Sequence, residues 1–362
     1  MLTGDDLTSW NVQSARYFPG ERTMATLGSA PLGLAISREQ CAPERGDWAD
    51  QAASRGWEIR LGHGPIGDGL LALGALEAFR EITERQECEY FGPRPDVFGI
   101  FDNIRTSLKK SGSPHIIRSL AGTNSRLKYF ANPDSSRLRL AERGHGLALF
   151  ADLPIRFYLE IEEWSGQRLA AERDVLPHVS TSSRRRNDLL VVVGATSNPD
   201  KKALLARHVK ALVSEFGETF EIVVLLGGSQ SEAPFVQSRK VRVLAGEPIN
   251  RCTDLFGSAT AVVGSDTGLT HLAAITSDSR GSRTPTLGLH SRHSFLKWST
   301  GSPLHGAIAT PFAQMMAAAD ACPVRDRIDD RLWGDSSSME SISNEILVRS
   351  VRSLLEEAAS CA

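Results

Sequence analysis

Residues 264–274, GSDTGLTHLAA, carry the side chains whose types and spacing point most directly to chemistry. An apolar strand pattern runs into a polar turn, and a helical pattern follows. Asp266 or Thr267 is a natural N-cap, which leaves the N–H groups and the positive dipole end of the first helical turn open to an anion. Gly268 would let a phosphate approach the backbone, and His271 lies one turn later on the same face. The segment predicts a pyrophosphate site, although an ordinary helix start has the same pattern.

Two more polar turns follow strand patterns in the same half of the chain. The first, GATSNPDK, carries the hydroxyls of Thr196 and Ser197 and the ammonium group of Lys201. These groups suit phosphate oxygens, and Lys201 would neutralise charge that builds on a leaving diphosphate. The second, GGSQSE, ends at Glu232, whose carboxylate can accept hydrogen bonds from a ribose diol. A solvated loop and a helix-start glutamate are the simpler alternatives for these two turns.

A fourth turn, GHGPIGDG, follows the first clear strand pattern of the chain. Asp68 sits at the start of the next helical pattern, where it could act as general base for an acceptor hydroxyl or as a simple N-cap. Gly67 beside it is our candidate for contact with the acceptor. Residues 62–67 also match GxGxxG, with Glu87 and Glu89 roughly 20 residues further on. That match favours an alternative function, an NAD-dependent oxidoreductase.

Strands and helices alternate along the chain, and these elements must position the turns. Alternation of this kind predicts an α/β fold with parallel sheets covered on both faces, and ligands then bind beyond the carboxyl ends of the strands. Strand patterns cover residues 57–61, 189–193, 220–226, 241–244, 261–263 and 286–289, and helical patterns cover 70–84, 201–216, 249–258, 267–275 and 341–359.

The length of 362 residues predicts two domains rather than one. The polar segment 178–188, HVSTSSRRRND, is the best linker candidate. We therefore expect a first Rossmann-like domain and a second one to face each other across a cleft. The predicted divisions are an N-terminal extension at 1–55 that packs on the first domain, the first domain at 56–183, the second domain at 184–335, and a C-terminal helix at 336–362.

Composition excludes several classes of function. A net charge of −2 gives no reason to expect nucleic acid as a partner. The five cysteines form no CxxC pair, so neither a disulfide framework nor a zinc site is expected, and a reducing cytoplasm fits best. The first residues do not resemble a secretory signal, and the longest apolar runs are far shorter than the ~20 residues that span a bilayer.

Residues 101–150 form a locally basic stretch, with nine Lys or Arg against three acidic residues. The stretch could bind a phosphorylated or acidic acceptor. It could equally be a solvated surface, which is the commoner reason for such a run of charge.

In combination, the four turns resemble the bacterial heptosyltransferases, glycosyltransferase family 9. DTGLTHLAA resembles the signature D-T-G-x-x-H-x-x-A of that family, PTLGLH resembles the strand and turn after it, and ATSNPDK and GPIGDG resemble its lysine-containing and opening motifs. The resemblance implies the GT-B fold, in which two Rossmann-like domains face an interdomain cleft. The first 55 residues have no counterpart in the usual family pattern, and residues 85–180 match it poorly.

The resemblance also implies an inverting, metal-independent transfer from a nucleotide-diphosphate sugar, with ADP-heptose or a close relative as donor and with no cofactor. The acceptor would be a saccharide of the lipopolysaccharide-core type or a small-molecule natural product. A catalytically silent nucleotide-sugar-binding protein is a third possibility. The implied roles are general base for Asp68, diphosphate binding for Thr196, Ser197, Lys201, Thr267 and Gly268, sugar or phosphate binding for Asp266 and His271, and ribose binding for Glu232.

Overall fold

The computed structural model describes most of the C-terminal half of the chain and separate elements of the N-terminal half. The described residues are 26–27, 30–31, 58–61, 66–67, 69–71, 73, 88–91, 95–101, 104–107, 117–119, 178–194, 202–227, 240–293, 298, 300, 302, 304–310, 312–313 and 338–360.

The C-terminal domain is built on a six-stranded sheet in which every neighbouring pair is parallel. Numbered within the domain, the strand order is 3-2-1-4-5-6, which is the order of the Rossmann fold. The order reverses between the first and fourth strands, β8 and β11, and ligands bind at such a switch point. In spatial order the strands are β10 (Val241–Ala245), β9 (Glu221–Leu226), β8 (Leu189–Val193), β11 (Ala261–Ser265), β13 (Thr286–His290) and β14 (His305–Ala309).

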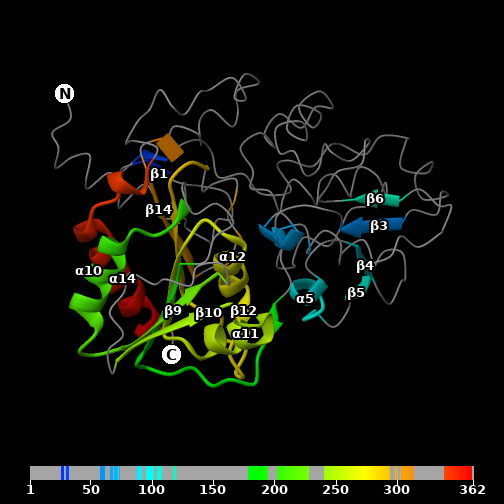
Figure 1. The fold of residues 1–362 in the computed structure, drawn as a ribbon, viewed down its shortest axis with the longest axis horizontal. Coiled ribbons are helices and arrows are strands. Elements are labelled where there is room, and N and C mark those ends of the chain that lie inside the picture. The colour runs from blue at the N-terminus through cyan, green and yellow to red at the C-terminus, as the bar shows by residue number, and fades with distance from the viewer. Residues whose placement is uncertain are drawn as a thin grey trace.

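Helices cover both faces of this sheet (Figure 1). The helices α10 (Ala206–Phe216) and α14 (Asn344–Ser360) pack together on one side, and α11 (Ile249–Ser258) and α12 (Gly268–Ala274) lie on the other. All residues of β8, β11 and β13 are buried, which explains why LLVVV of β8 reads as a continuous apolar run rather than an alternating one. The short 3₁₀ helix η5 (Met339–Ser341) leads into α14.

The N-terminal domain contains a four-stranded parallel sheet with the order β5 (Ile104–Ser107), β4 (Cys88–Phe91), β3 (Glu58–Leu61), β6 (Ile117–Ser119). Within the domain this is 3-2-1-4, the same beginning as in the C-terminal sheet. The helix α5 (Pro95–Phe98) packs closely on the helical residues after β3, since a Cβ on Gly69 would lie 2.5 Å from Cζ of Phe98.

A separate antiparallel pair joins β1 (Thr26–Leu27) to β2 (Ala30–Pro31) in the predicted extension. A search of the described residues finds no helix that has both the length and the hydropathy needed to cross a membrane.

The segment 178–188, predicted as a linker, is bonded to the C-terminal domain. Its strand β7 (Val179–Ser180) pairs in parallel with β12 (Thr276–Ser277). Thr181 reinforces this pairing, because its N–H and its hydroxyl both donate to the carbonyl of Ser277, at 3.0 and 3.1 Å.

Two element predictions were wrong in detail. The helix expected from residue 201 begins at Ala206, because Leu205 has extended backbone angles of φ −72° and ψ 149° and ends the preceding turn. The sequence pattern also did not indicate the edge strand β14, which begins with the polar residue His305 and continues with Gly306. The predicted C-terminal helix is confirmed by α14.

Candidate functional site at the switch point of the C-terminal sheet

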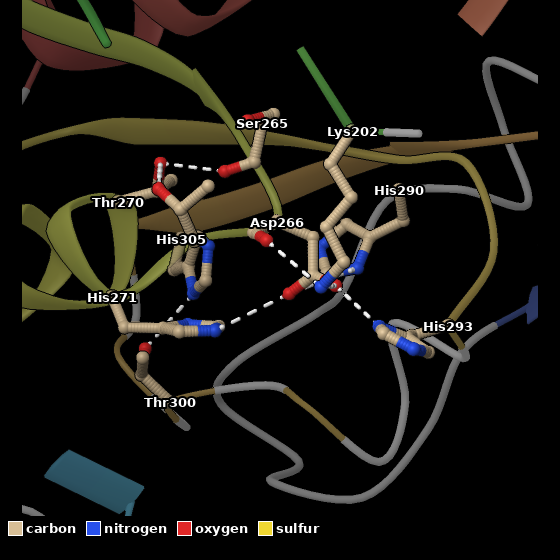
Figure 2. Close-up of polar contacts among 10 residues, drawn as sticks. Lys202, Ser265, Asp266, Thr270, His271, His290, His293, Thr300 and His305 are labelled. Carbon is tan, nitrogen blue, oxygen red and sulfur yellow. Dashed lines mark hydrogen bonds and ion pairs between the residues drawn. The ribbon is translucent and has the colours of Figure 1, made fainter. Parts of the chain in front are cut away.

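Two side chains meet where the strand order reverses. Lys202 follows β8 and Asp266 follows β11, and Nζ of Lys202 donates to Oδ2 of Asp266 at 2.9 Å and to its carbonyl oxygen at 3.3 Å (Figure 2). The side chain of Asp266 is only 5% exposed, and that of Lys202 is 19% exposed. The ion pair therefore ties together the two loops that border the switch point.

Three imidazoles surround the same carboxylate. Nδ1 of His293 lies 2.9 Å from Oδ2, while Nε2 of His271 and Nδ1 of His290 lie 3.4 and 4.0 Å from Oδ1. Figure 2 shows His271 and His293 approaching Asp266 from opposite sides. A fourth histidine, His305 on β14, stacks edge-on against His271 with 6.1 Å between ring centroids.

Burial alone would raise the pKa of Asp266. Hydrogen bonds from His271 and His293, together with the charges of His290 and Lys202, outweigh burial and hold the pKa well below its ordinary value. Burial lowers the pKa of His290 to about 4, so this ring is neutral near pH 7. Lys202 and the two hydrogen-bonding imidazoles are then the groups that keep Asp266 ionised.

The buried histidines make a pH-dependent contribution to stability. In the folded chain, burial lowers the pKa of His290 from 6.5 to about 4 and that of His305 further below its ordinary value. The unfolded chain takes up these protons first, so stability should be full above about pH 6.5 and fall as the pH drops toward 4. Asp266 adds a further loss of stability only when the pH falls below 3.8, the pKa of this carboxyl in the unfolded chain.

We therefore expect the free energy of unfolding, measured by denaturant titration at pH 5, 6 and 7, to decrease with falling pH. Each buried histidine contributes at most about 1.4 kcal/mol per pH unit. Replacing His290 with glutamine should flatten this slope, because one of the titrating groups is gone. An unchanged slope in the His290→Gln variant would contradict the assignment.

The helix α12 starts directly beside this network. Thr267 is the N-cap residue, but its side chain makes no capping hydrogen bond, so the first N–H groups of the helix are not satisfied by it. Thr270 donates instead to the carbonyl of Ser265 at 2.6 Å. Gly264 makes that bond possible, since a Cβ at this position would lie 2.3 Å from Oγ1 of Thr270.

The start of α12 also touches the N-terminal domain. A Cβ on Gly268 would lie 2.8 Å from both Cβ and Cγ2 of Ile66 and 3.1 Å from the backbone nitrogen of Gly67. A Cβ on Gly67 would lie 3.1 Å from Cδ2 of His271. Glycines on both sides thus let the turn GPIGDG of the N-terminal domain contact the turn DTG of the C-terminal domain.

Replacing Gly268 with alanine should push these two turns apart. The new methyl group would overlap Ile66 and crowd the backbone of Gly67, which cannot rotate away. We expect at least a 10-fold loss of kcat/KM, because misplacement of about 1 Å can cost 10²-fold in rate. Gly306→Ala is the matched control, since its methyl group would meet only ordinary contacts of 3.5 Å or more. Equal activity of the two variants would show that this contact is unimportant.

The structure brings together five of the residues predicted from sequence, namely Asp266, Thr267, Gly268, His271 and Gly67. The other predicted residues lie outside the described ones and stay predictions; they are Asp68, Thr196, Ser197, Lys201 and Glu232.

Sequence reasoning missed Lys202 and the histidines at 290, 293 and 305. A usable signal was the tetrapeptide HSRH, whose first residue ends the buried strand β13. In a parallel sheet this position lies at the same edge as Asp266. No group of three or more His, Cys, Asp or Glu side chains within the described residues is arranged to hold a metal ion.

Comparison with known proteins finds a family match for the segment that contains the site. Residues 144–319 match the model of glycosyltransferase family 9 (heptosyltransferase). No curated protein matches the sequence.

Solved structures share the fold at low sequence identity. A family 9 glycosyltransferase from Veillonella parvula DSM 2008 aligns with a TM-score of 0.51 and 13% identity, over 83% of this chain and 98% of that one. The iron-containing dodecameric glycosyltransferase TibC from enterotoxigenic E. coli H10407 aligns with a TM-score of 0.55 and 12% identity, over 84% of this chain and 77% of that one. Two parallel sheets of Rossmann order agree with these GT-B relatives. Residues 144–319 are therefore similar to glycosyltransferase family 9 (heptosyltransferase), and the chain shares the GT-B fold with these solved structures.

Proposed function

We propose that the chain transfers a sugar, with inversion, from a nucleotide-diphosphate sugar to an acceptor hydroxyl. The observation that carries this proposal is the Asp266–Lys202 pair at the switch point of the C-terminal sheet, inside the segment that matches the family. ADP-heptose or a close relative is the proposed donor. TibC, which shares the fold with a TM-score of 0.52, was solved in complex with ADP-D-beta-D-heptose.

The donor diphosphate would lie across the carboxyl ends of β8 and β11. We assign its binding to the hydroxyls of Thr196 and Ser197, the ammonium group of Lys201, and the N–H groups of Thr267 and Gly268. Lys202 adds a second positive charge at the same edge of the sheet, 2.9 Å from Asp266. Glu232, from the loop after β9, would accept hydrogen bonds from the ribose hydroxyls.

Asp266 and His271 have a supporting role in this proposal. Both side chains are at most 5% exposed, so they are better placed to orient neighbouring groups than to contact much of the donor. Asp266 fixes Lys202 and His293, and His271 borders Gly67 of the acceptor domain. A sugar bound between the two domains would then reach only the edge of the His271 ring.

In the proposed reaction, Asp68 takes the proton of the acceptor hydroxyl. The acceptor oxygen forms a bond to the anomeric carbon, and the bond from that carbon to the β-phosphate oxygen breaks with its electron pair on the phosphate. Lys201, Lys202 and the start of α12 would supply the stabilising charge, so we propose that no metal ion or other cofactor is required. We also propose that the reaction takes place in the cytoplasm, in line with the cysteine pattern.

The acceptor is proposed to be a saccharide of the lipopolysaccharide-core type or a small-molecule natural product. The basic stretch 101–150 is the segment that would favour an acidic or phosphorylated acceptor.

A thermal-shift screen tests the proposed function. ADP, ADP-heptose, UDP, GDP, UDP-glucose and NAD are added to the purified chain at millimolar concentration, because a ligand that binds only the folded state raises the melting temperature. We expect stabilisation by ADP and ADP-heptose, release of ADP from ADP-heptose, and no change of that rate with EDTA. Stabilisation by NAD alone would instead support the oxidoreductase alternative, and ADP-heptose binding without turnover would support the silent binding protein.

A further inference from the structure

We propose that His293 is a catalytic acid, which donates the proton on its Nε2 to the phosphate oxygen that leaves the anomeric carbon. This inference rests on the proposed glycosyl transfer and adds a residue to it.

The first argument is the orientation of the ring. Nδ1 of His293 lies 2.9 Å from Oδ2 of Asp266, and an ionised carboxylate can only accept a hydrogen bond. Nδ1 must therefore carry a hydrogen, and Nε2 is the nitrogen left for proton exchange. A carboxylate that fixes an imidazole in this way is the usual arrangement for a histidine that transfers protons.

The second argument is access. Among the side chains around Asp266, those of His271 and His290 are 3% and 2% exposed, whereas that of His293 is 35% exposed. Asp266 itself is 5% exposed. His293 is thus the imidazole of this group that a bound molecule can reach from solvent, and Lys202 is the accessible cation beside it.

The third argument is position. His293 follows β13, which pairs with β11, so the ring lies at the carboxyl edge of the sheet one strand from the switch point. It shares the oxygen Oδ2 of Asp266 with Lys202. A group that sits beside the proposed diphosphate cation is close to where the leaving oxygen would develop its charge.

The charged and titratable groups around His293 are Asp266, Lys202 and His290. Oδ2 of Asp266 contacts both the His293 ring and the ammonium group of Lys202, and His290 is neutral near pH 7 because burial lowers its pKa to about 4. The ring of Trp298 lies beside that of His293 with 5.7 Å between centroids.

The proposed step is balanced in protons and electrons. The carbon–oxygen bond of the donor breaks, and its electron pair stays on the β-phosphate oxygen. The imidazolium of His293 gives its Nε2 proton to that oxygen and becomes neutral, while the proton of the acceptor hydroxyl passes to Asp68. Exchange with solvent returns both side chains to their starting state after the products leave.

Two substitutions separate proton donation from the support of Asp266. In His293→Asn, the amide can still donate to Asp266 from near the Nδ1 position, but no group remains at Nε2. In His293→Gln, the amide can reach the Nε2 position without being able to titrate. His178→Asn is the matched control, since it removes a partly buried histidine directly before β7, in contact with Ser277 and Arg283 rather than Asp266.

The measured quantities are the rate of ADP release from ADP-heptose between pH 5.5 and 9, with water receiving the heptose in place of the acceptor, and the thermal shift caused by ADP. For His293→Asn we expect kcat to fall about 10²-fold, the lower end for general acids because a diphosphate already leaves readily. The activity of the wild type should fall at high pH, and this fall should disappear in both variants. The kcat of His293→Gln should lie between those of His293→Asn and the wild type. ADP should stabilise both variants as much as the wild type.

Three results would overturn the inference. One is a kcat of His293→Asn within about 3-fold of the wild type, and another is a pH profile that keeps its high-pH decline in both variants. The third is a loss of ADP binding that accounts for the whole effect, which would make His293 a binding residue only. If the wild type itself neither binds ADP nor releases it from ADP-heptose, the proposed function fails first.

Discussion

Replacing Asp68 with asparagine should lower kcat by about 10²–10⁴-fold, which is the usual contribution of a general base. The amide keeps the size and shape of the side chain but cannot take the proton of the acceptor hydroxyl. Binding of ADP should be unchanged, because the proposed nucleotide site lies on the other domain. The rate of ADP release at saturating ADP-heptose, with water in the place of the acceptor hydroxyl, measures the effect.

Asp254→Asn is the matched control for this substitution. Asp254 is an exposed aspartate on α11 that belongs neither to the network around Asp266 nor to the proposed site residues, so its loss should leave kcat unchanged. A kcat for Asp68→Asn close to that of the control would show that another group is the base.

Replacing Asp266 with asparagine should damage both stability and activity. The neutral amide has the same volume, but it leaves Lys202 without its counter-ion and offers the histidines one acceptor oxygen in place of two. Breaking a buried ion pair costs about 3–5 kcal/mol, and we expect about 3 kcal/mol because Lys202 keeps 19% of its surface in solvent. Activity should fall at least about 10²-fold, since the loops proposed to bind the diphosphate lose their link.

Denaturant unfolding and ADP release measure these two effects. Asp188→Asn serves as control, because Asp188 forms an ion pair with Arg186 while 60% exposed, and such surface pairs contribute about 0–1 kcal/mol. An Asp266→Asn variant with the stability and rate of the control would mean that the network around Asp266 is not a functional unit.

Much of the C-terminal sheet could be predicted from sequence. The runs LLVVV at 189–193 and IVVLL at 222–226 are apolar at every position, and only a strand buried on both faces requires that pattern. The polar residues after β11 likewise had to lie at the carboxyl edge of a parallel sheet. Asp266, Thr267 and His271 could therefore be assigned to one site before their contacts were known.

The histidine network could not be predicted in the same way. His290 and His293 come from the end of β13 and the loop after it, and His305 from the start of β14; only the fold places the first two at the carboxylate of Asp266 and the third against His271. Sequence spacing does not reveal which strands are neighbours when the order reverses, as it does between β8 and β11. Lys202 was overlooked for a related reason, because Lys201 beside it fits the family motif and a helix was expected to begin there.

The contact between the two glycine turns is also a consequence of the fold. Gly67 and Gly268 are separated by about 200 residues in the sequence, and each lies in a motif that explains its own glycine locally. Only the three-dimensional arrangement shows that Ile66 and His271 occupy the space that a Cβ would need.

Hydrogen exchange in the presence of ADP tests the central claim, that the switch point of the C-terminal sheet binds the nucleotide, most directly. We predict slower exchange in residues 261–275 with ADP and with ADP-heptose, and a much smaller effect of either ligand in the Asp266→Asn variant. NAD should leave this segment unchanged. Protection by NAD confined to residues 58–73, with no effect of ADP on residues 261–275, would contradict the account.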